Sequence, residues 1–414
     1  MKRLIHTPEG VRDIIGIECD KKRYLESRID RLFRTYGYQS IQTPTFEFFD
    51  VFGQEVGTTP SKDLYKFFDR EGNTLVLRPD FTPSIARSVA MYFGEETMPL
   101  RLSYQGSVFS NNSSYQGRLK EMTHMGAELI NDDSVEADAE ILSLVVSLMQ
   151  KAGLEEFQVT VGMVDFFGAL AEEAGMDEDT LYELKSLLAV QNLFGAQELI
   201  GRLKLRADLE QALLALPELF GNEEMLSRAR TLTSNPKALA AISRLERISE
   251  ILKYYHCEKY VAFDLGMVSD YSYYTGIIFQ AYTYGSGDAV IKGGRYDRLL
   301  EQFGKKAAAV GFVAETDMLL LAIDRQRLRL PVEDIKTMLL YPATLEACAV
   351  RFAAAYRAKN QEMACVRLRE SLTLEDYVAY GKRNQFGRII RFKSETEAEA
   401  IDLTTGMSSP VTDL

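Results

Sequence analysis

The fold is decided by one stretch of sequence, Tyr104-Gln-Gly-Ser-Val-Phe-Ser-Asn-Asn-Ser-Ser-Tyr-Gln-Gly-Arg-Leu-Lys-Glu-Met-Thr-His-Met-Gly-Ala-Glu128. It lies within residues 1–165, which read as alternating strands and helices. Two polar residues near its end are His124 and Glu128. Taken alone, His124 is interpreted as a structural histidine with satisfied hydrogen bonds, although a neutral imidazole can also donate to and accept from a ligand. The blocks on either side decide between these interpretations.

The block that comes first in the chain is Arg34-Thr-Tyr-Gly-Tyr-Gln-Ser-Ile-Gln-Thr-Pro-Thr-Phe-Glu47. Gly37 predicts a helix end, and alternating residues predict a strand that runs into Pro44. The helix before it has an apolar face, because hydrophobic residues recur there at helical spacing. This face consists of Tyr24, Leu25, Ile29, Leu32 and Phe33.

A second block, Leu77-Arg-Pro-Asp-Phe-Thr-Pro-Ser-Ile-Ala-Arg87, follows an apolar run that predicts a strand. Asp80 and Thr82 supply a carboxylate beside a hydroxyl, which suits an ammonium group because such a group needs several acceptors. The alternative is that Asp80 or Thr82 caps the first turn of a helix. Both interpretations stay open.

Two more blocks follow the central stretch. The first is Asp264-Leu-Gly-Met-Val-Ser-Asp-Tyr-Ser-Tyr-Tyr-Thr-Gly-Ile-Ile-Phe-Gln280, whose aromatic alternation is typical of a half-buried strand. The second is Lys292-Gly-Gly-Arg-Tyr-Asp-Arg-Leu-Leu-Glu-Gln-Phe-Gly304, continued by Ala309-Val-Gly-Phe-Val-Ala-Glu-Thr-Asp-Met318. Its glycines would let the backbone approach a ligand closely, although Gly-Gly is also a common turn.

Together the five blocks resemble the adenylating core of histidyl-tRNA synthetase, over most of residues 1–325. The resemblance implies an α+β fold of the class II aminoacyl-tRNA synthetase type, with an antiparallel sheet flanked by helices. In that family the positions of Asp80 and Thr82 hold the amino group of histidine, and those of Glu128 and Tyr274 hold its imidazole. His124 stands where the family has a glutamine, and Tyr273 is retained. The implied histidine-binding set is Asp80, Thr82, His124, Glu128, Tyr273 and Tyr274.

Three positions depart from the synthetase pattern: Ser110, Ser269 and Met318. Each stands where the family has an arginine that meets ATP or the carboxylate of histidine. A hydrogen bond to a charged group contributes about 1.5–3 kcal/mol, so three lost contacts would remove on the order of 5–9 kcal/mol of transition-state stabilisation. Serine and methionine cannot replace the planar guanidinium fork, and Glu315 would repel a polyphosphate. We therefore expect no catalytic residues and no adenylating activity.

A synthetase-like pocket without this chemistry is similar to the regulatory subunits of ATP phosphoribosyltransferase. That resemblance implies a non-catalytic subunit in the first step of histidine biosynthesis, required by a short-form catalytic subunit and mediating feedback inhibition by histidine. It also implies a homodimer through the first block and a hetero-octamer with the catalytic subunit. The alternatives are an active histidyl-tRNA synthetase and a stand-alone histidine-binding protein.

The 414 residues predict two or three domains. We expect a synthetase-like core over residues 1–330, with a helical insertion at about 172–254, and a small α/β domain at 335–414 that has diverged from an anticodon-binding domain. In the insertion, breaks are predicted at Pro217 and Gly221, and an apolar stripe favours core packing over a partner groove. The stripe consists of Leu181, Leu184, Leu187 and Leu188. In the last domain we predict a helix at 344–358 and strands at 338–341, 364–368 and 388–392.

Composition argues against several classes of protein. The net charge of −12, without a basic face bearing aromatic residues, speaks against tRNA binding. Three histidines and four scattered cysteines predict no metal, no disulfide framework and no cofactor. The absence of a long apolar stretch or signal peptide predicts a cytoplasmic protein with no membrane segment. Asn131-Asp-Asp-Ser134 predicts a helix N-cap at Asp133 or Ser134, and not a magnesium–pyrophosphate site.

Overall fold

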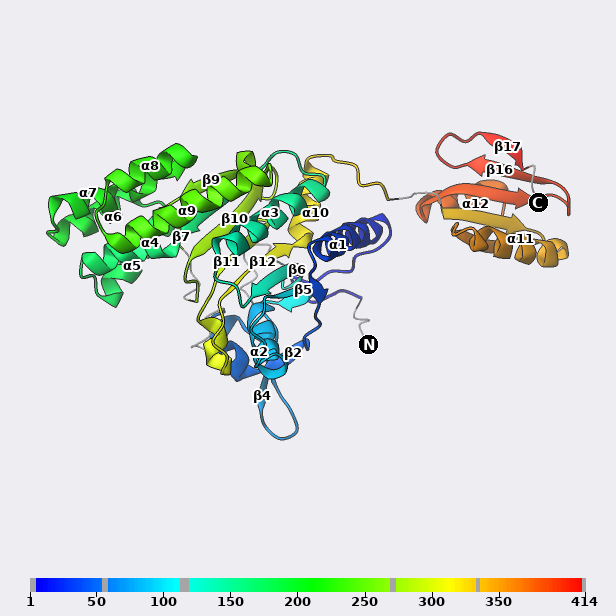
Figure 1. The fold of residues 1–414 in the computed structure, drawn as a ribbon. Coiled ribbons are helices and arrows are strands. Elements are labelled where there is room, and N and C mark those ends of the chain that lie inside the picture. The colour runs from blue at the N-terminus through cyan, green and yellow to red at the C-terminus, as the bar shows by residue number, and fades with distance from the viewer. Residues whose placement is uncertain (1–4, 54–58, 112–118, 269–272, 333–335, 412–414) are drawn as a thin grey trace. The chain divides into compact units, whose positions relative to one another are not determined.

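The computed structural model describes residues 5–53, 59–111, 119–268, 273–332 and 336–411. The chain divides into two compact units (Figure 1). One consists of residues 1–13 and 25–329, and the other of residues 14–24 and 330–414. Ser269, Ser272 and the tip of the central stretch, residues 112–118, lie outside the described residues.

A mixed sheet forms the centre of the larger unit, and the predicted α+β fold is confirmed. Its order within the described residues is β1-β5-β6-β12-β11-β10-β7-β9-β8. Neighbouring strands are antiparallel except at the pairs β1/β5 and β7/β9, which are parallel. The strands are β1 (Gln39–Ser40), β5 (Leu100–Phe109), β6 (Glu121–Ile130), β12 (Ala309–Glu315), β11 (Ile291–Arg295), β10 (Ile277–Thr283), β7 (Phe157–Met163), β9 (Val261–Asp264) and β8 (Phe220–Gly221).

Helices cover this sheet. Helix α3 (Val135–Lys151) contacts β7 and β12, and α10 (Thr316–Arg325) contacts β6 and β12. Helix α2 (Thr82–Tyr92) packs with Leu102 and Tyr104 of β5 in one apolar cluster. Close to α2 lies a three-stranded sheet of order β2-β4-β3, formed by β2 (Phe46–Phe48), β4 (Thr74–Leu77) and β3 (Lys66–Phe68) (Figure 1).

Helix α1 (Ile17–Thr35) buries the predicted apolar face, except that Tyr24 is only half-buried. Gly37 follows the helix with a positive φ of 82°, as a helix stop requires. The predicted strand into Pro44 is wrong beyond β1, which has only two residues. Pro44 has no N–H to donate, and the carbonyls of Thr43 and Pro44 accept instead from Nη1 of Arg78, at 2.9 and 3.1 Å.

The region of the expected insertion is helical. Breaks fall at Pro217, inside a 3₁₀ turn, and at Gly221, where β8 pairs with β9. Strand β8 is too short to have been predicted. Leu184 and Leu188 of the apolar stripe are buried. The helices are α4 (Val164–Glu173), α5 (Glu178–Ala189), α6 (Leu193–Arg202), α7 (Ala207–Ala215), α8 (Glu223–Thr231) and α9 (Pro236–Tyr254).

The smaller unit contains a sheet of order β14-β13-β15-β16-β17. The three predicted strands and the predicted helix are confirmed as β13 (Lys336–Tyr341), β14 (Met363–Arg367), β15 (Phe386–Phe392) and α11 (Glu346–Ala358). Three further elements were not predicted: α12 (Leu374–Arg383), β16 (Ala398–Asp402) and β17 (Ser408–Val411). Helix α12 begins with a capping box between Thr373 and Asp376, which is a local signal for a helix start.

None of the helices in the described part of the chain combines the length and apolar character needed to cross a membrane.

Candidate functional site

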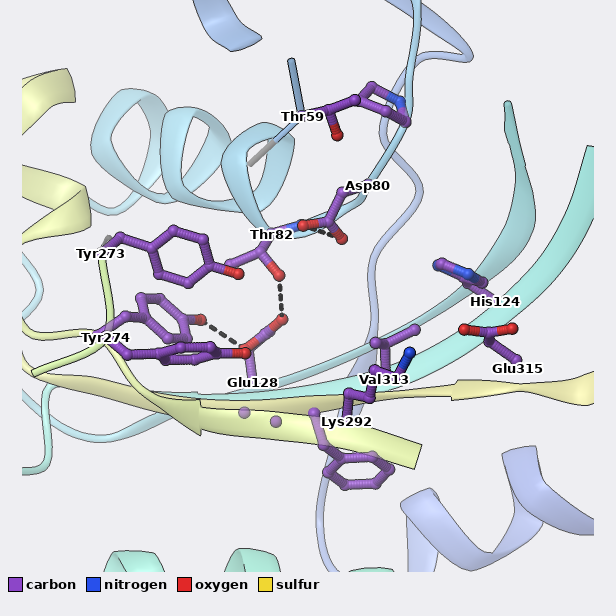
Figure 2. A pocket seen from close by; sticks show the side chains of 15 residues that line it. Thr59, Asp80, Thr82, His124, Glu128, Tyr273, Tyr274, Lys292, Val313 and Glu315 are labelled. Carbon is purple, nitrogen blue, oxygen red and sulfur yellow. Dashed lines mark hydrogen bonds between the residues drawn. The ribbon is translucent and has the colours of Figure 1, made fainter. Parts of the chain in front are cut away.

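A pocket with a cavity volume of about 100 Å³, open to solvent, lies on β6, β11 and β12, beside the start of α2 (Figure 2). The structure brings together in its lining all six residues that the sequence predicted as a set. They are Asp80, Thr82, His124, Glu128, Tyr273 and Tyr274.

Glu128 is the most buried acid of the pocket, with an exposed fraction of 1%. It accepts a hydrogen bond from the Thr82 hydroxyl at 3.1 Å and another from the Tyr296 hydroxyl at 2.5 Å. Burial raises the pKa of Glu128 to about 8, so that the carboxyl is neutral at pH 7. Gly311 makes room for it, because a Cβ at that position would lie 1.6 Å from Glu128 Oε2.

Asp80 stands just before α2. Its Oδ1 accepts from the backbone N–H groups of Phe81, at 2.6 Å, and Thr82, at 3.4 Å. Asp80 therefore satisfies two N–H groups at the start of the helix without being its N-cap, which is Phe81, and it also lines the pocket. Burial raises the pKa of Asp80. The Thr82 side chain does not cap the helix, since its hydroxyl donates to Glu128.

Three tyrosine rings form the wall beside Glu128. The centroids of Tyr273 and Tyr274 are 4.7 Å apart, and Tyr296 meets Tyr273 edge-on with centroids at 6.0 Å. Gly294 allows Tyr274 its place, because a Cβ there would lie 2.7 Å from the ring. The Gly-Gly pair was predicted to let the backbone approach a ligand, and in the structure Gly294 also makes room for the Tyr274 ring. The wall offers aromatic faces and hydroxyls to a planar ligand group.

His124 differs from the prediction made for it in isolation. It is 8% exposed, and neither ring nitrogen has a hydrogen-bond partner among the described residues. It is therefore not a satisfied structural histidine. Burial lowers the pKa of His124 to about 4, so the ring is neutral at pH 7. In the register of β6 and β12, His124 lies opposite Glu315, and Figure 2 shows the two together at one end of the pocket.

The sequence missed two residues that contribute to the pocket, Tyr296 and Lys292. Both belong to the Lys-Gly-Gly-Arg-Tyr run, in which only the glycines were predicted to matter for a ligand. The signal was the strand alternation, which places residues 292, 294 and 296 on one face. Lys292 is the one lysine or arginine in the described lining.

The two described positions that lack the family arginine are not in that lining. Ser110 is half-buried after β5, and its backbone N–H donates to the Lys120 carbonyl at 2.9 Å. Met318 is half-buried in the first turns of α10. Glu315, in contrast, lines the pocket. Among the described residues, no group of three or more histidine, cysteine or acidic side chains is arranged to hold a metal ion.

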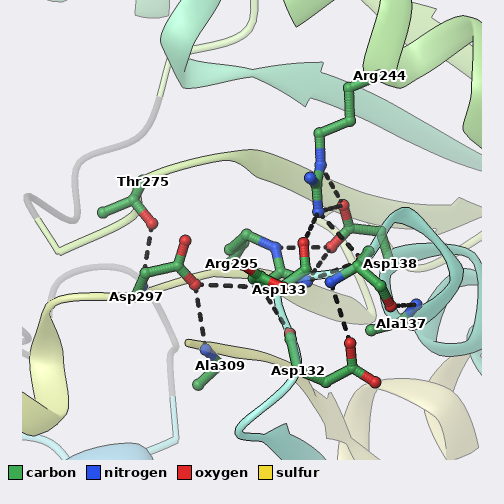
Figure 3. A network of polar contacts seen from close by, with 10 residues as sticks. Asp132, Asp133, Ala137, Asp138, Arg244, Thr275, Arg295, Asp297 and Ala309 are labelled. Atoms are coloured by element: carbon green, nitrogen blue, oxygen red, sulfur yellow. Dashed lines mark hydrogen bonds and ion pairs between the residues drawn. The ribbon is translucent and has the colours of Figure 1, made fainter. Parts of the chain in front are cut away.

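A buried ionic network connects helix α9 to α3 and β11 beside this pocket (Figure 3). The Asp138 carboxylate of α3 is fully buried and pairs with Arg295 of β11 at 2.7 Å and with Arg244 of α9 at 2.6 Å. Arg295 also pairs with Asp297 at 3.1 Å. The backbone N–H of Asp297 donates to the Thr275 hydroxyl, next to the tyrosine wall. Ser134, the predicted N-cap, caps α3 by accepting from the Ala137 N–H.

Comparison with known proteins places this geometry among relatives. A family model described as histidyl-tRNA synthetase matches residues 10–319. The ATP phosphoribosyltransferase regulatory subunit of Acetivibrio thermocellus is 37% identical over 99% of this chain and 97% of its own length. That of Ruminiclostridium cellulolyticum is 34% identical over 98% and 96%. The crystal structure of an ATP phosphoribosyltransferase regulatory subunit/histidyl-tRNA synthetase from Bacillus halodurans superposes with a TM-score of 0.84, at 30% identity, over 94% of this chain and 98% of the other.

Proposed function

Since this chain belongs to the family of ATP phosphoribosyltransferase regulatory subunits, we propose that it regulates a short-form catalytic subunit in the first step of histidine biosynthesis, with histidine as its effector. The observation that carries this proposal is a pocket that brings together the six residues predicted to recognise histidine, with the buried carboxyl of Glu128 among them and one cation in the described lining. Such a pocket suits an amino acid with an imidazole better than it suits a nucleotide.

Histidine fits the pocket by its functional groups. Its ammonium binds the Asp80 carboxylate and the Thr82 hydroxyl, which supply the acceptors that it needs. Its imidazole reaches Glu128 and Tyr274 beside the tyrosine wall. The carboxyl of Glu128, neutral at pH 7, can give its proton to the imidazole, and the product is a buried ion pair held by Thr82 and Tyr296. Binding of this kind needs no metal and no cofactor.

Catalysis is not part of the proposed role. Ser110 and Met318 supply no positive charge where an adenylating enzyme needs it, and Ser269 has none by its chemistry. Glu315 adds a negative charge to the pocket, where a triphosphate would be repelled. The substrates of the transferase reaction, ATP and phosphoribosyl pyrophosphate, bind the catalytic subunit instead.

Assembly is proposed at two levels. The first is a homodimer through the class II-type interface near the first block. Exposed phenylalanines on one face of the three-stranded sheet support it: Phe46 is 53%, Phe48 55% and Phe67 37% exposed, and contiguous exposed apolar side chains mark interaction surfaces. The second is a heteromer with the catalytic subunit, for which the family resemblance implies a hetero-octamer. Histidine then shifts activity through its different affinity for two assembly states.

The decisive experiment mixes this protein with a purified short-form catalytic subunit and measures phosphoribosyl-ATP formation. We expect activation on mixing and inhibition by histidine. The variant Glu128→Ala should still form the complex and activate, while inhibition by histidine is lost. Absence of both complex and activation would overturn the proposal. Inhibition that is unchanged in Glu128→Ala would move histidine out of this pocket.

Two measurements separate the alternatives. Histidine-dependent ATP–pyrophosphate exchange would identify an active histidyl-tRNA synthetase. Histidine binding by a protein that neither co-purifies with nor activates the catalytic subunit would identify a stand-alone histidine-binding protein.

A further inference from the structure

The two ends of the pocket differ in how their polar groups are satisfied. At the Glu128 end, the carboxyl already has hydroxyl donors from Thr82 and Tyr296. At the other end, His124 has no hydrogen-bond partner among the described residues. Figure 2 shows Lys292 between these ends, with Val313 beside it. The hydrogen-bonding groups that still need a partner therefore lie at the His124 end of the pocket.

His124 belongs to an inner strand of the sheet and is only 8% exposed, so solvent has little access to its ring. It stands on β6, flanked by β5 and β12, opposite Gly106 and Glu315. Its neutral ring has one N–H donor and one acceptor nitrogen. Leaving such groups buried and unpaired is costly. A ligand atom that accepts a hydrogen bond would remove part of that cost.

Lys292 is the cation that is available to a ligand here. Its Nζ is 3.4 Å from Asp288 Oδ2, an ion pair in which both side chains are partly exposed. The arginines of this region are committed elsewhere. Arg78 donates to the carbonyls of Ser107, Thr43 and Pro44, and Arg295 is paired with Asp138.

Acidic groups near His124 limit what Lys292 can hold. Glu315 lies opposite His124 in the sheet, and Asp317 accepts from the Thr123 N–H at 2.8 Å. Both carboxylates repel an extended polyanion. A ligand group with a single negative charge can approach the Lys292 side, because one lysine neutralises it and one imidazole N–H donates to it.

We propose that Lys292 and His124 form a carboxylate subsite, in which the Lys292 ammonium and the His124 ring N–H bind the α-carboxylate of the effector amino acid. The subsite rests on the proposed function, which assigns the ammonium and the imidazole of histidine but leaves the carboxylate without a partner. Lys292 thereby supplies a positive charge for the ligand from a different position in the fold. Ser110, Ser269 and Met318, which stand where the synthetase family has arginines, do not supply one. The subsite also determines specificity, since amines and alcohols with the same imidazole would lack this contact.

Calorimetric titration with L-histidine and L-histidinol tests the subsite, because histidinol has an alcohol in place of the carboxylate. The wild type should bind histidine more tightly than histidinol by roughly 10- to 100-fold, the range of one or two charge-assisted hydrogen bonds. Lys292→Met should lose most of this preference and keep its affinity for histidinol. His124→Phe should reduce the preference in the same direction. Lys306→Met, a lysine outside the pocket, is the matched control and should behave as wild type.

The outcomes separate the two levels of the argument. No binding of histidine to the wild type would overturn the proposed function. Histidine binding with an unchanged preference in Lys292→Met would overturn the subsite alone. So would an equal loss of affinity for both ligands, since Lys292 would then support only the shape of the pocket. Circular dichroism and a thermal melt of each variant verify that it is folded.

Discussion

Replacing Glu128 with glutamine tests the electrostatic state of the pocket. Burial raises the pKa of Glu128 in the folded protein to about 8, whereas an ordinary glutamate has a pKa of 4.5. Between these pH values the folded protein keeps a proton that the unfolded chain has released. The free energy of unfolding therefore falls as the pH rises through this window, and the loss ends above about pH 8.

The Glu128→Gln variant has no such proton, and its side-chain carbonyl can still accept from Thr82 or Tyr296. About two pH units of the window lie above pH 6. At about 1.4 kcal/mol per unit, the wild type should lose about 2–3 kcal/mol more than the variant between pH 6 and pH 9. His124 titrates at lower pH: its folded pKa is lowered to about 4, so it adds stability as the pH rises from about 4 to 6.5. That contribution is common to both proteins and cancels in the comparison.

Urea unfolding followed by circular dichroism, at each pH from 6 to 9 and without histidine, provides the measurement. A surface change, Glu301→Gln, is the control and should follow the wild type. If the curves of wild type and Glu128→Gln run parallel across this pH range, the reasoning that Glu128 is a buried neutral carboxyl is refuted.

Three further changes have defined outcomes. Arg295→Met removes one partner of the buried Asp138 and should lower the free energy of unfolding by roughly 3–5 kcal/mol in urea titrations. Adding Asp138→Leu should restore part of the loss, and no recovery would contradict the role of the pair. Gly311→Ala places a Cβ in the space of Glu128 and should weaken histidine binding by at least about tenfold in calorimetry, in a protein that remains folded by circular dichroism; unchanged affinity would contradict this. Phe48→Asp should raise the dimer dissociation constant by roughly tenfold or more in analytical ultracentrifugation, while an unaltered dimer would remove this face of the three-stranded sheet from the interface.

The sequence correctly predicted the elements that are determined by residues close to one another in the chain. The apolar face of α1 follows from helical spacing, and Leu25, Ile29, Leu32 and Phe33 are buried as predicted. Ser134 caps α3 because a hydroxyl before an Ala/Glu/Leu helix accepts from its first turn. The strand into Pro44 failed because a distant residue, Arg78, uses the carbonyls that a strand partner would need. That competition is not visible in the segment itself.

The candidate site shows the same division. The resemblance to the synthetase family indicated which six residues would meet in one pocket, but it gave no information on their hydrogen bonds. The state of His124 depends on burial between β5 and β12, strands that are far apart in the sequence. Lys292 gained significance only when the structure placed it in the pocket as the described lining's one cation. Burial and charge are properties of the assembled sheet, and a linear motif does not contain them.

The buried Asp138 network determines how early the core can fold while the chain is being synthesised on the ribosome. Asp138 is synthesised 106 residues before Arg244 and 157 residues before Arg295, its two partners. Until both have emerged, the N-terminal end of α3 carries a carboxylate that cannot be buried without a large desolvation cost. This position therefore stays in water until Arg244 and Arg295 have been translated. The pocket can be completed only late in synthesis, when β11 enters the sheet and brings Arg295, Tyr296 and Lys292 with it.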